Sequence, residues 1–365
     1  MPQQLFQLGE FGLIAQIRER FRAPEGVTGI GDDCAILPQN TGRDTLVSTD
    51  MLIEGTHFLR RDISPYDLGW KSAAVNISDI AAMGGHPTAT FLSLALPGNV
   101  TTEWTDEFLR GYAELSDRFG VPLLGGDTTA SPDRICINVT VLGECPSVRG
   151  ALRRDGARKG DVICVTGTLG DSAGGLKAIF KGLRRDADVQ RLIERHYRPV
   201  PRVPEGEELR LNLGVNAMMD LSDGLASDLQ HILDASGMDA EIDLAAIPLS
   251  LALKHVCASQ GWDPVQLAVS GGEDYELLFT CTPQAEALLS VPHFVIGKIT
   301  DRTRGTARIT WRGAQGPVAP GFDHFKKGNK TGVHKNGHWC NNSGHLPPQT
   351  PEKGPKRRQV SKNIA

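Results

Sequence analysis

The sequence predicts an α+β protein with two domains and a disordered basic tail. Its 365 residues, 40% of them hydrophobic, have the length of two or three ordinary domains and can bury a large core. Strand-like and helix-like stretches follow one another in mixed order, and two segments rich in glycine, proline and charge interrupt them. We therefore expect a first domain over residues 1–149, a second over 150–325 and a tail over 326–365.

The first domain is expected to combine strands with an amphipathic helix. Residues 45–49 and 135–142 are rich in β-branched and apolar residues, which predicts two strands. Residues 70–83 predict a helix, because apolar side chains recur there at helical spacing: Trp70, Ala73, Ala74, Ile77, Ile80 and Ala81. The same spacing places Asn76 and Asp79 together on another face of this helix.

The boundary between the domains is expected within residues 147–160, where glycines and charged residues break the pattern. The second domain then opens with a buried strand over 161–166, and a glycine-rich loop over 167–175 leads into a helix over 176–182. Backbone amides of such a loop can hold a phosphate at a helix N-terminus. The same glycines would equally serve close packing of strand, turn and helix, so both interpretations stay open.

Charge is distributed unevenly along the chain. The net charge is −4, but residues 326–365 carry nine Lys or Arg against one Glu, which leaves −12 for residues 1–325. A body this acidic argues against a nucleic-acid surface, which needs clustered cations, and suits a protein that collects divalent cations. The tail consists largely of Gly, Asn, Lys, Pro and His without apolar periodicity, which is typical of disorder.

A cytoplasmic, reduced protein is expected. The chain starts Met-Pro-Gln-Gln, without a basic segment followed by an apolar one, and contains no run of about 18 apolar residues. Its seven cysteines lack CxxC spacing, so we expect packing cysteines rather than disulfides or a zinc site. The histidines and cysteine of the tail match no standard zinc pattern either.

Five short segments place aspartates among small residues next to apolar stretches. They are Gly31-Asp32-Asp33, Ser48-Thr49-Asp50, Ile77-Ser78-Asp79, residues 125–129 around Asp127, and Asp220-Leu221-Ser222-Asp223-Gly224. We expect these aspartates in turns, at strand ends or helix starts, where a carboxylate points into a cleft. Any one such segment is more often a turn or an N-cap than a ligand, but five in one chain favour a shared site.

Clustered carboxylates predict bound Mg²⁺ and phosphoryl transfer. Buried carboxylates are costly unless cations or hydrogen bonds compensate them. Mg²⁺ usually takes one or two carboxylates together with substrate phosphates, so many aspartates suggest several ions on a polyphosphate. Phosphoryl transfer mainly needs alignment and charge neutralisation. The sequence contains no Walker A, protein-kinase or Rossmann signature, so an ATP site would require another fold.

The order and spacing of eight motifs from about residue 9 to residue 325 resemble the thiamine-monophosphate kinases. The motifs lie at residues 29–35, 48–50, 55–58, 74–84, 125–129, 165–170, 220–224 and 270–276. Within the wider superfamily of AIR synthetase and selenophosphate synthetase the aspartate turns recur more loosely. The motifs Gly55-Thr-His-Phe58 and Ser270-Gly-Gly-Glu-Asp-Tyr-Glu276 are specific to the thiamine enzymes.

The resemblance implies a two-domain AIR-synthetase-like fold, with an N-terminal domain that contributes strands to a dimeric β-barrel and a C-terminal α/β sandwich. It implies a homodimer that uses ATP and several Mg²⁺ ions to phosphorylate thiamine monophosphate directly and in line, as the last step of thiamine diphosphate biosynthesis. No covalent nucleophile is expected. The family ends close to Phe325, whereas this chain continues for 40 residues.

Matching positions imply roles for individual residues. The Mg²⁺ ions would be held by Asp33, Ser48, Thr49, Asp50, Asp79, Asp127, Asp220 and Asp223. ATP would contact Gly126, Arg154 and Ser222, and thiamine monophosphate would contact His57, Glu273 and Phe322. Glu273 would attract the cationic thiazolium or hydrogen-bond the pyrimidine, and Phe322 would offer a ring face for stacking.

Three alternatives are open at this stage. A sister enzyme is one, although a selenophosphate synthetase generally needs a Cys or selenocysteine near the N-terminus, and here Cys34 follows the aspartate pair. A regulatory module would bind ATP without transferring phosphate. A nucleic-acid binder acting through the tail would bind in a salt-sensitive manner and lose binding on truncation at Lys326.

Overall fold

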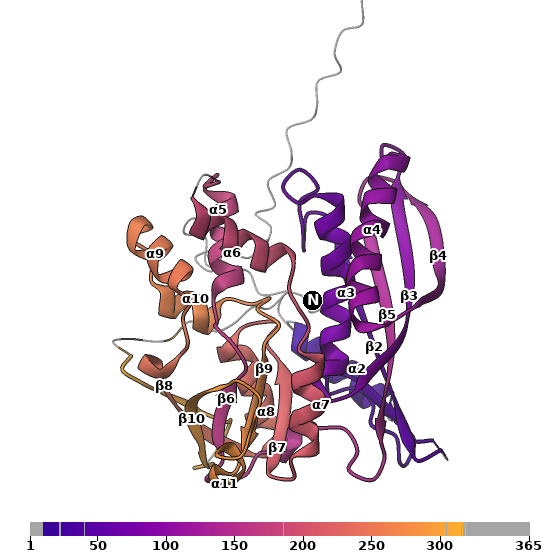
Figure 1. Ribbon diagram of the computed structural model, residues 1–365. Helices are drawn as coiled ribbons and strands as arrows, with labels where there is room; N and C mark the ends of the chain where they lie inside the picture. Colours follow the sequence, from indigo (N-terminus) through magenta and orange to yellow (C-terminus); the bar gives the residue numbers. More distant parts are fainter. Residues whose placement is uncertain are drawn as a thin grey trace, which may run out of the picture.

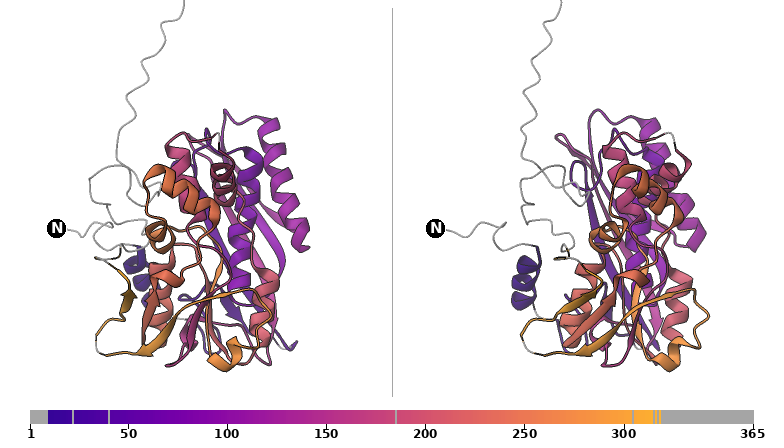
Figure 2. Two further views of the ribbon diagram at one scale, coloured as in Figure 1. Left: turned by 60° about the vertical axis from the view of Figure 1, so that its left-hand side comes forward. Right: turned by 90° about the vertical axis from the view of Figure 1, so that its left-hand side faces the viewer.

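The computed structural model describes residues 10–318, except for positions 22, 40, 185, 304, 315 and 317. Phe322 and the predicted tail lie outside the described residues. A short helix, α2 (Glu10–Arg20), stands at the periphery (Figure 2) and precedes the first sheet. That sheet has the order β1 (Ala35–Leu37), β2 (Arg43–Ile53), β5 (Cys136–Pro146), β3 (His86–Pro97), β4 (Leu123–Ser131). Both strands predicted for this part of the chain are confirmed, within β2 and β5.

Helices α3 (Pro65–Ala82) and α4 (Thr102–Phe119) cover one face of this sheet, as Figure 1 shows. α3 confirms the predicted helix, and all six residues of its predicted apolar stripe are buried. It begins at Ser64, whose Oγ accepts a hydrogen bond from the Asp67 amide at 3.0 Å. The helices cross closely, because a Cβ at Gly69 would lie 1.9 Å from the Phe108 carbonyl oxygen, and one at Gly111 equally close to that of Tyr66.

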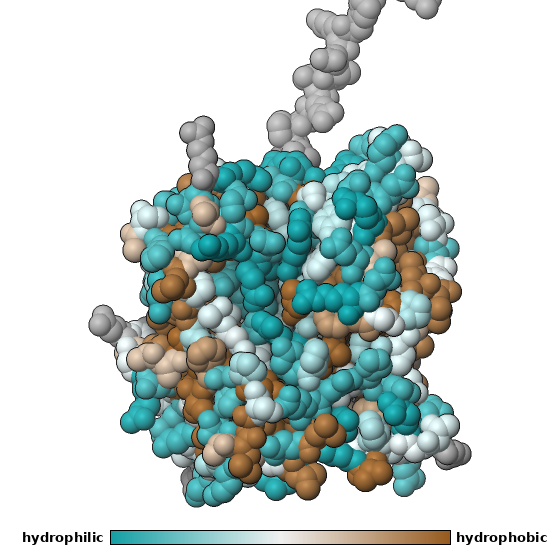
Figure 3. Space-filling view, in the orientation of Figure 1, coloured by the Kyte–Doolittle hydropathy of each residue, from teal (hydrophilic) through white to brown (hydrophobic). Residues whose placement is uncertain are grey.

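The two faces of the first sheet differ. Alternate residues of β5, such as Val139 and Val141, are buried under the helices, while the opposite face carries Met51 and Phe91, 53% and 38% exposed. Strand β4 is exposed along nearly its whole length and forms one edge of the sheet. Within the described residues the sheet is therefore open, and hydrophobic surface is visible along the right-hand side of Figure 3, where this sheet lies.

The second half of the chain builds a six-stranded sheet. Its order is β11 (Ile309–Arg312), β8 (Met238–Asp243), β10 (Phe294–Asp301), β6 (Val162–Val165), β9 (Leu277–Cys281), β7 (Val215–Asp220). All neighbours are antiparallel except β11 and β8. Helix α8 (Leu225–Ser236) shares a buried core with this sheet. The strand predicted over 161–166 is confirmed in β6.

The remaining helices surround this sheet and join the two halves. They are η1 (Arg154–Gly156), α5 (Asp171–Phe180), α6 (Ala187–Tyr197), α7 (Val203–Leu211), η2 (Leu244–Ala246), α9 (Leu251–Gln260), α10 (Pro264–Ser270) and α11 (Pro283–Glu286). Apolar residues of α5, α6 and α9 belong to the same buried cluster as those of α3. A continuous core therefore fixes the position of α3 between the two sheets.

The prediction that a helix starts at residue 176 was wrong by five residues. Helix α5 begins at Asp171 and contains Gly174 and Gly175 within its length. A Cβ at Gly175 would lie 2.1 Å from the Leu192 carbonyl oxygen of α6. These glycines are therefore required by helix packing, which is the second of the two interpretations that the sequence left open.

The aspartates at 50, 79 and 127 do not lie in turns or at strand ends. Asp50 lies inside β2, which extends beyond the predicted strand to Ile53, Asp79 lies inside α3, and Asp127 lies inside β4. Glycine-rich residues 125–129 read as a turn because glycine is common in turns, but here Gly126 is needed in a strand. A Cβ at this residue would lie 1.7 Å from the Leu92 carbonyl oxygen of β3.

None of the described helices is both long enough and apolar enough to cross a bilayer.

Candidate active site

Three of the predicted metal ligands converge between the two halves of the molecule. Carboxylate oxygens of Asp33, Asp79 and Asp220 all lie within 4.8 Å of one another. Asp33 comes from the loop before β1, Asp79 from α3 and Asp220 from the last position of β7. Residues almost 190 positions apart in sequence thus supply oxygen atoms at the separation that one divalent cation requires.

Each carboxylate of this acidic cluster is held by a polar partner. Ser48 Oγ of β2 donates to Asp79 Oδ2 at 2.5 Å, and Ser78 Oγ of α3 donates to Asp220 Oδ2 at 2.5 Å. Arg154 forms an ion pair with Asp33. The predicted ligand Ser48 therefore lies at the cluster, and Ser78 is a neighbour that the sequence reading did not single out.

The cluster is electrostatically unfavourable without a cation. Burial raises the pKa of Asp220 to about 7, and the charge of Asp33 adds to this effect. Burial, followed by the charges of Asp50 and Asp220, also raises the pKa of Asp79 well above its usual value. Because a divalent cation would remove this penalty and its preferred ligands are carboxylate oxygens, the donor set fits Mg²⁺.

Asp50 belongs to the same neighbourhood. It faces α3 from β2, and its backbone amide donates to Asn76 Oδ1 at 3.1 Å. Asp50 lies two residues after Ser48 on the same face of β2, and Ser48 bonds to Asp79. The predicted face of α3 that carries Asn76 and Asp79 is thus the face that meets β2 beside the acidic cluster.

Two predicted ligands point to the other side of the sheet. The register aligns Thr49 with Thr140 and Phe91, and Met51 with Asn138, Ser93 and Asp127, so both rows lie on the face away from the helices. Thr49 Oγ1 donates to the Val139 carbonyl oxygen at 3.0 Å, and Asp127 Oδ1 accepts from the Thr128 amide at 2.9 Å. Strands β2 and β4 are about 14 Å apart, so the fold of one chain does not bring Asp127 and Gly126 to the acidic cluster.

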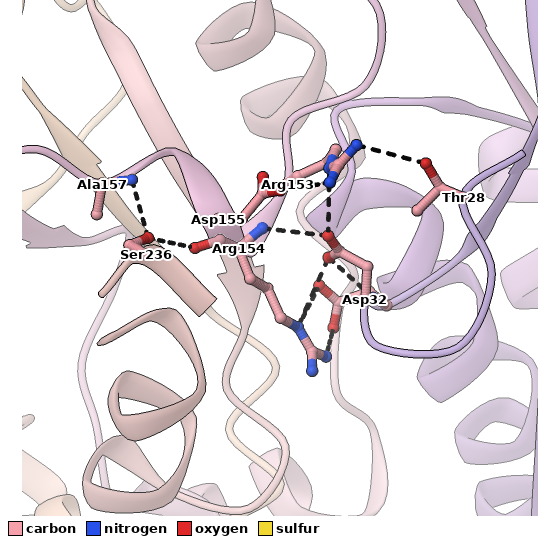
Figure 4. A network of polar contacts seen from close by, with 8 residues as sticks. Thr28, Asp32, Arg153, Arg154, Asp155, Ala157 and Ser236 are labelled. Atoms are coloured by element: carbon pink, nitrogen blue, oxygen red, sulfur yellow. Dashed lines mark hydrogen bonds and ion pairs between the residues drawn. The ribbon is translucent and has the colours of Figure 1, made fainter. Parts of the chain in front are cut away.

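A network of charges connects the acidic cluster to the segment between the sheets (Figure 4). Asp32 accepts from the Arg154 amide at 3.2 Å, and its carboxylate also lies 3.6 Å from Arg154 Nε. The Arg154 carbonyl in turn accepts from Ser236 Oγ of α8 at 2.9 Å. Burial, then the charge of Asp33, raises the pKa of Asp32 to about 7. Asp32 is therefore a site residue that was missed, although its position beside Asp33 was visible in sequence.

A hollow of about 720 Å³ adjoins this network. It lies between α2 and residues 27–32, and Arg18, Phe21, Asp32 and Arg153 are among the residues that line it. Its volume is within the range of small-molecule sites.

The segments 220–224 and 270–276 pack backbone to backbone. The Ser222 carbonyl accepts from the Glu273 amide at 2.8 Å, and a Cβ at Gly272 would lie 2.3 Å from the same oxygen. Glu273 and Tyr275 have φ values of 65° and 51°, a left-handed conformation that costs energy in residues other than glycine. Asp223 donates its amide to Asp228 Oδ2 at 3.2 Å, which fixes the loop before α8.

The Glu273 carboxylate is anchored by two buried residues. Lys71 Nζ of α3 lies 2.8 Å from Glu273 Oε1, and His196 Nδ1 of α6 lies 3.4 Å from Oε2. The next residue, Asp274, accepts from the amides of Gly170 and Ser172 at 2.6 and 3.2 Å. The amides at the start of α5, one candidate for phosphate binding, are thus bonded to a side chain of this chain.

His57 lies four residues after Ile53, the last residue of β2, and bonds back to it. Its Nδ1 accepts from the Ile53 amide at 2.9 Å, which places the proton of the neutral ring on Nε2.

The chain matches both domains of one enzyme superfamily. Residues 31–145 match the AIR synthase related protein N-terminal domain, and residues 158–310 match the corresponding C-terminal domain. A structure of the hydrogenase maturation protein HypE in complex with ATP has a TM-score of 0.61 and 21% identity, covering 85% of this chain and 95% of that one, and shows the shared fold. The fold and the acidic cluster thus define an AIR synthase related protein.

Relatives with higher sequence identity indicate one family within this superfamily. The thiamine-monophosphate kinase of Escherichia coli O157:H7 is 44% identical over 335 residues, which cover 87% of this chain and 98% of that protein. That of Haemophilus influenzae is 39% identical over 88% of this chain and 99% of that protein. A structure of AaThiL complexed with AMPPCP and TMP superimposes with a TM-score of 0.80 at 34% identity, covering 89% of this chain and 99% of that one. The chain belongs to the thiamine-monophosphate kinase family.

Proposed function

We propose that this protein transfers the γ-phosphoryl group of ATP to thiamine monophosphate and so forms thiamine diphosphate, the last step of that biosynthesis. The observation that carries the proposal is the convergence of Asp33, Asp79 and Asp220 in a chain 44% identical to a thiamine-monophosphate kinase. Support for both substrates comes from the related AaThiL structure, which holds AMPPCP and TMP.

Several Mg²⁺ ions are proposed to bind at the acidic cluster. Asp33, Ser48, Asp50, Asp79 and Asp220 would hold them, with Asp223 close by on the loop after β7. Bound Mg²⁺ neutralises the charge that develops on a transferred phosphoryl group. Arg154, which pairs with Asp33 in this structure, would give its guanidinium to a phosphate of ATP, and Ser222 would contact ATP from the loop after β7.

The acceptor is proposed to lie toward Glu273 and His57, with Phe322 completing its site from outside the described residues. The attacking atom would be an oxygen of the substrate's own phosphate. Because this oxygen is already ionised near neutral pH, the transfer needs neither a strong general base nor a covalent nucleophile. The protein's task is to align the two phosphates in line.

A homodimer is proposed, in which the outer faces of two first sheets close into one barrel. Support comes from the exposed Met51 and Phe91, from the open edge strand β4, and from Thr49 and Asp127, which face this side. Pairing would cover an apolar face and remove an exposed edge, which is how barrels protect such strands. Thr49 and Asp127 would then contribute from the face that the dimer encloses, and Gly126 from the backbone of the same strand β4.

The division at residues 149 and 325 and the cytoplasmic location are part of the same proposal. The strands of the first sheet lie within residues 35–146 and those of the second within 162–312, which agrees with a boundary between them.

Turnover by the purified full-length protein tests the function. ATP, Mg²⁺ and thiamine monophosphate should yield thiamine diphosphate and ADP in equal amounts, and EDTA should abolish both. Thiamine and an aminoimidazole ribonucleotide serve as control acceptors. ADP formed only with another acceptor, or ATP binding with no transfer, would reject the proposed function while the fold assignment stands.

A further inference from the structure

Lys71 is a buried lysine to which the proposed reaction mechanism assigns no role. It lies in α3, a helix in which 14 residues are buried, and its own side chain is 1% exposed. Its Nζ lies 2.8 Å from Glu273 Oε1, whereas the Glu273 side chain is 22% exposed. A lysine is almost never buried to this extent unless it is paired, so this contact accounts for its position.

The pair has a defined place relative to the acidic cluster. Lys71 and Ser78 are seven residues apart on α3, about two turns or 10 Å along the helix axis, and both face the second half of the chain. Ser78 holds Asp220, and Lys71 holds Glu273. One rigid helix therefore sets the separation between the acidic cluster and the Glu273 carboxylate.

The pairing changes what Glu273 can offer a ligand. Lys71 supplies a positive charge at hydrogen-bond distance in a buried setting, where little water screens it. The same nitrogen of His196, Nδ1, lies 3.4 Å from the other oxygen of Glu273 and 3.0 Å from Ser172 Oγ. A carboxylate neutralised in this way is a weak counter-ion for a second cation but remains a good hydrogen-bond acceptor.

We propose that Lys71 is a positioning residue, which together with Glu273 forms a neutral pair that recognises the amino group of the substrate's pyrimidine ring rather than the charge of its thiazolium. This inference rests on the proposed function, because it takes Glu273 as a substrate contact. Of the two roles that the sequence left open for Glu273, the proposal favours the hydrogen bond with the pyrimidine over attraction of the cationic thiazolium.

Substitution of Lys71 tests the positioning role. In Lys71→Met the KM for thiamine monophosphate should rise about tenfold or more, while the KM for ATP and kcat change less than about threefold. Lys177→Met is the control, because Lys177 is a lysine of helix α5 that is partly buried away from Glu273, with its Nζ 4.6 Å from the centre of the Trp262 ring. A purely structural role for Lys71 would lower the active fraction and leave both KM values unchanged.

Lys71→Met removes the lysine that pairs with Glu273, so a second variant separates loss of folding from loss of substrate binding. The double variant Lys71→Met/Glu273→Gln removes both charges and should recover the melting temperature. The proposal requires that Lys71→Met raises the KM for thiamine monophosphate only while Glu273 is present, so the double variant should have the same KM as Glu273→Gln alone. An unchanged KM in folded Lys71→Met, or an equal rise with and without Glu273, overturns it.

Two substrate analogues separate the recognition modes in the wild-type enzyme. Replacing the pyrimidine amino group by an oxo group should raise KM about tenfold, more than replacing the thiazolium by a neutral ring. In Glu273→Ala the penalty for the oxo analogue should disappear. A larger penalty for the neutral ring would overturn the proposal, whereas absent turnover of thiamine monophosphate by the wild-type protein would reject the proposed function itself.

Discussion

At the scale of single residues, function and stability oppose each other in the acidic cluster. Asp33, Asp79 and Asp220 bring oxygens within 4.8 Å, and burial raises the pKa values of Asp79 and Asp220. Without a cation, the folded protein bears the cost of these charges near neutral pH. Substitutions there are therefore expected to affect activity and stability in opposite directions.

Asp220→Asn should lower kcat at least about 100-fold, because it removes a carboxylate from the proposed Mg²⁺ site. In EDTA at pH 8 the same variant should be more stable than the wild type, on the order of 1 kcal/mol. The folded pKa of about 7 exceeds the unfolded value of 3.8, so the wild-type protein loses stability as pH rises through this window.

Denaturant unfolding of the metal-free proteins at pH 5 and pH 8 measures this difference. The difference in stability should be larger at pH 8 than at pH 5, because the wild-type loss begins above the unfolded pKa of 3.8 and is complete only above about pH 7. Asp301→Asn, at an exposed ion pair with Lys159, is the control and should match the wild type in both assays. Full turnover by Asp220→Asn at limiting Mg²⁺ would contradict the assigned ligand.

The Mg²⁺ concentration that gives half-maximal activity should fall about tenfold between pH 6 and pH 8. Binding requires the ionised carboxylates, and burial raises the pKa of the proposed ligand Asp220 to about 7 and that of Asp79 well above its usual value. Protons therefore compete with the metal at pH 6 and much less at pH 8. Titration of MgCl₂ at fixed ATP across this range measures the effect, and a half-maximal concentration independent of pH would argue against these ligands.

At the scale of elements, α3 organises the molecule. It packs on β2 and β5, crosses α4, and carries Lys71, Asn76, Ser78 and Asp79 toward the site. The sequence revealed this helix because its apolar spacing is regular. It did not reveal the partners of Lys71 or Ser78, since Glu273 and Asp220 lie more than 140 residues away and meet α3 only through the tertiary fold.

Gly69→Ala should destabilise the protein by about 1–3 kcal/mol or more, because the added Cβ would lie 1.9 Å from the Phe108 carbonyl oxygen and force α3 and α4 apart. Gly98→Ala is the matched control, since a Cβ there meets nothing within 4 Å. Thermal unfolding monitored by circular dichroism compares the two. Equal melting temperatures would show that the helices separate without cost.

The two glycine-rich segments that were predicted incorrectly share one cause. Glycine-rich residues 125–129 and 167–175 resembled loops, but Gly126, Gly174 and Gly175 lie in a strand and a helix. Each of these glycines permits close approach of a neighbouring backbone or side chain. Local sequence cannot distinguish a glycine required by a turn from one required by such an approach, because the approaching group comes from elsewhere in the chain.

At the scale of the whole molecule, the two-domain AIR synthase related fold was predictable only through resemblance to a family. Composition and periodicity indicated an α+β protein with several strands and a central helix. They contained no information on the order of strands in either sheet, on Asp274 as the partner of the amides at the start of α5, or on which aspartates meet.

The proposed dimer is testable through its apolar face. Phe91→Asp should weaken self-association at least about tenfold, because it would bury a charge between the two sheets. Leu251→Asp, at an exposed position on α9, is the control and should leave self-association unchanged. Sedimentation velocity at several concentrations measures both. A wild-type protein that stays monomeric at high concentration would reject the dimer.

The alternation along β2 has a further consequence for descent and for engineering. Ser48 and Asp50 face the acidic cluster while Thr49 faces the opposite side of the sheet. Loss or gain of a single residue within this strand would turn the side chains that face the acidic cluster to the opposite side of the sheet. No point substitution elsewhere could return Ser48 and Asp50 to the cluster. Length changes among functional descendants of this chain should therefore be confined to the loops, and an alignment that opens a gap within residues 48–50 would pair the wrong positions.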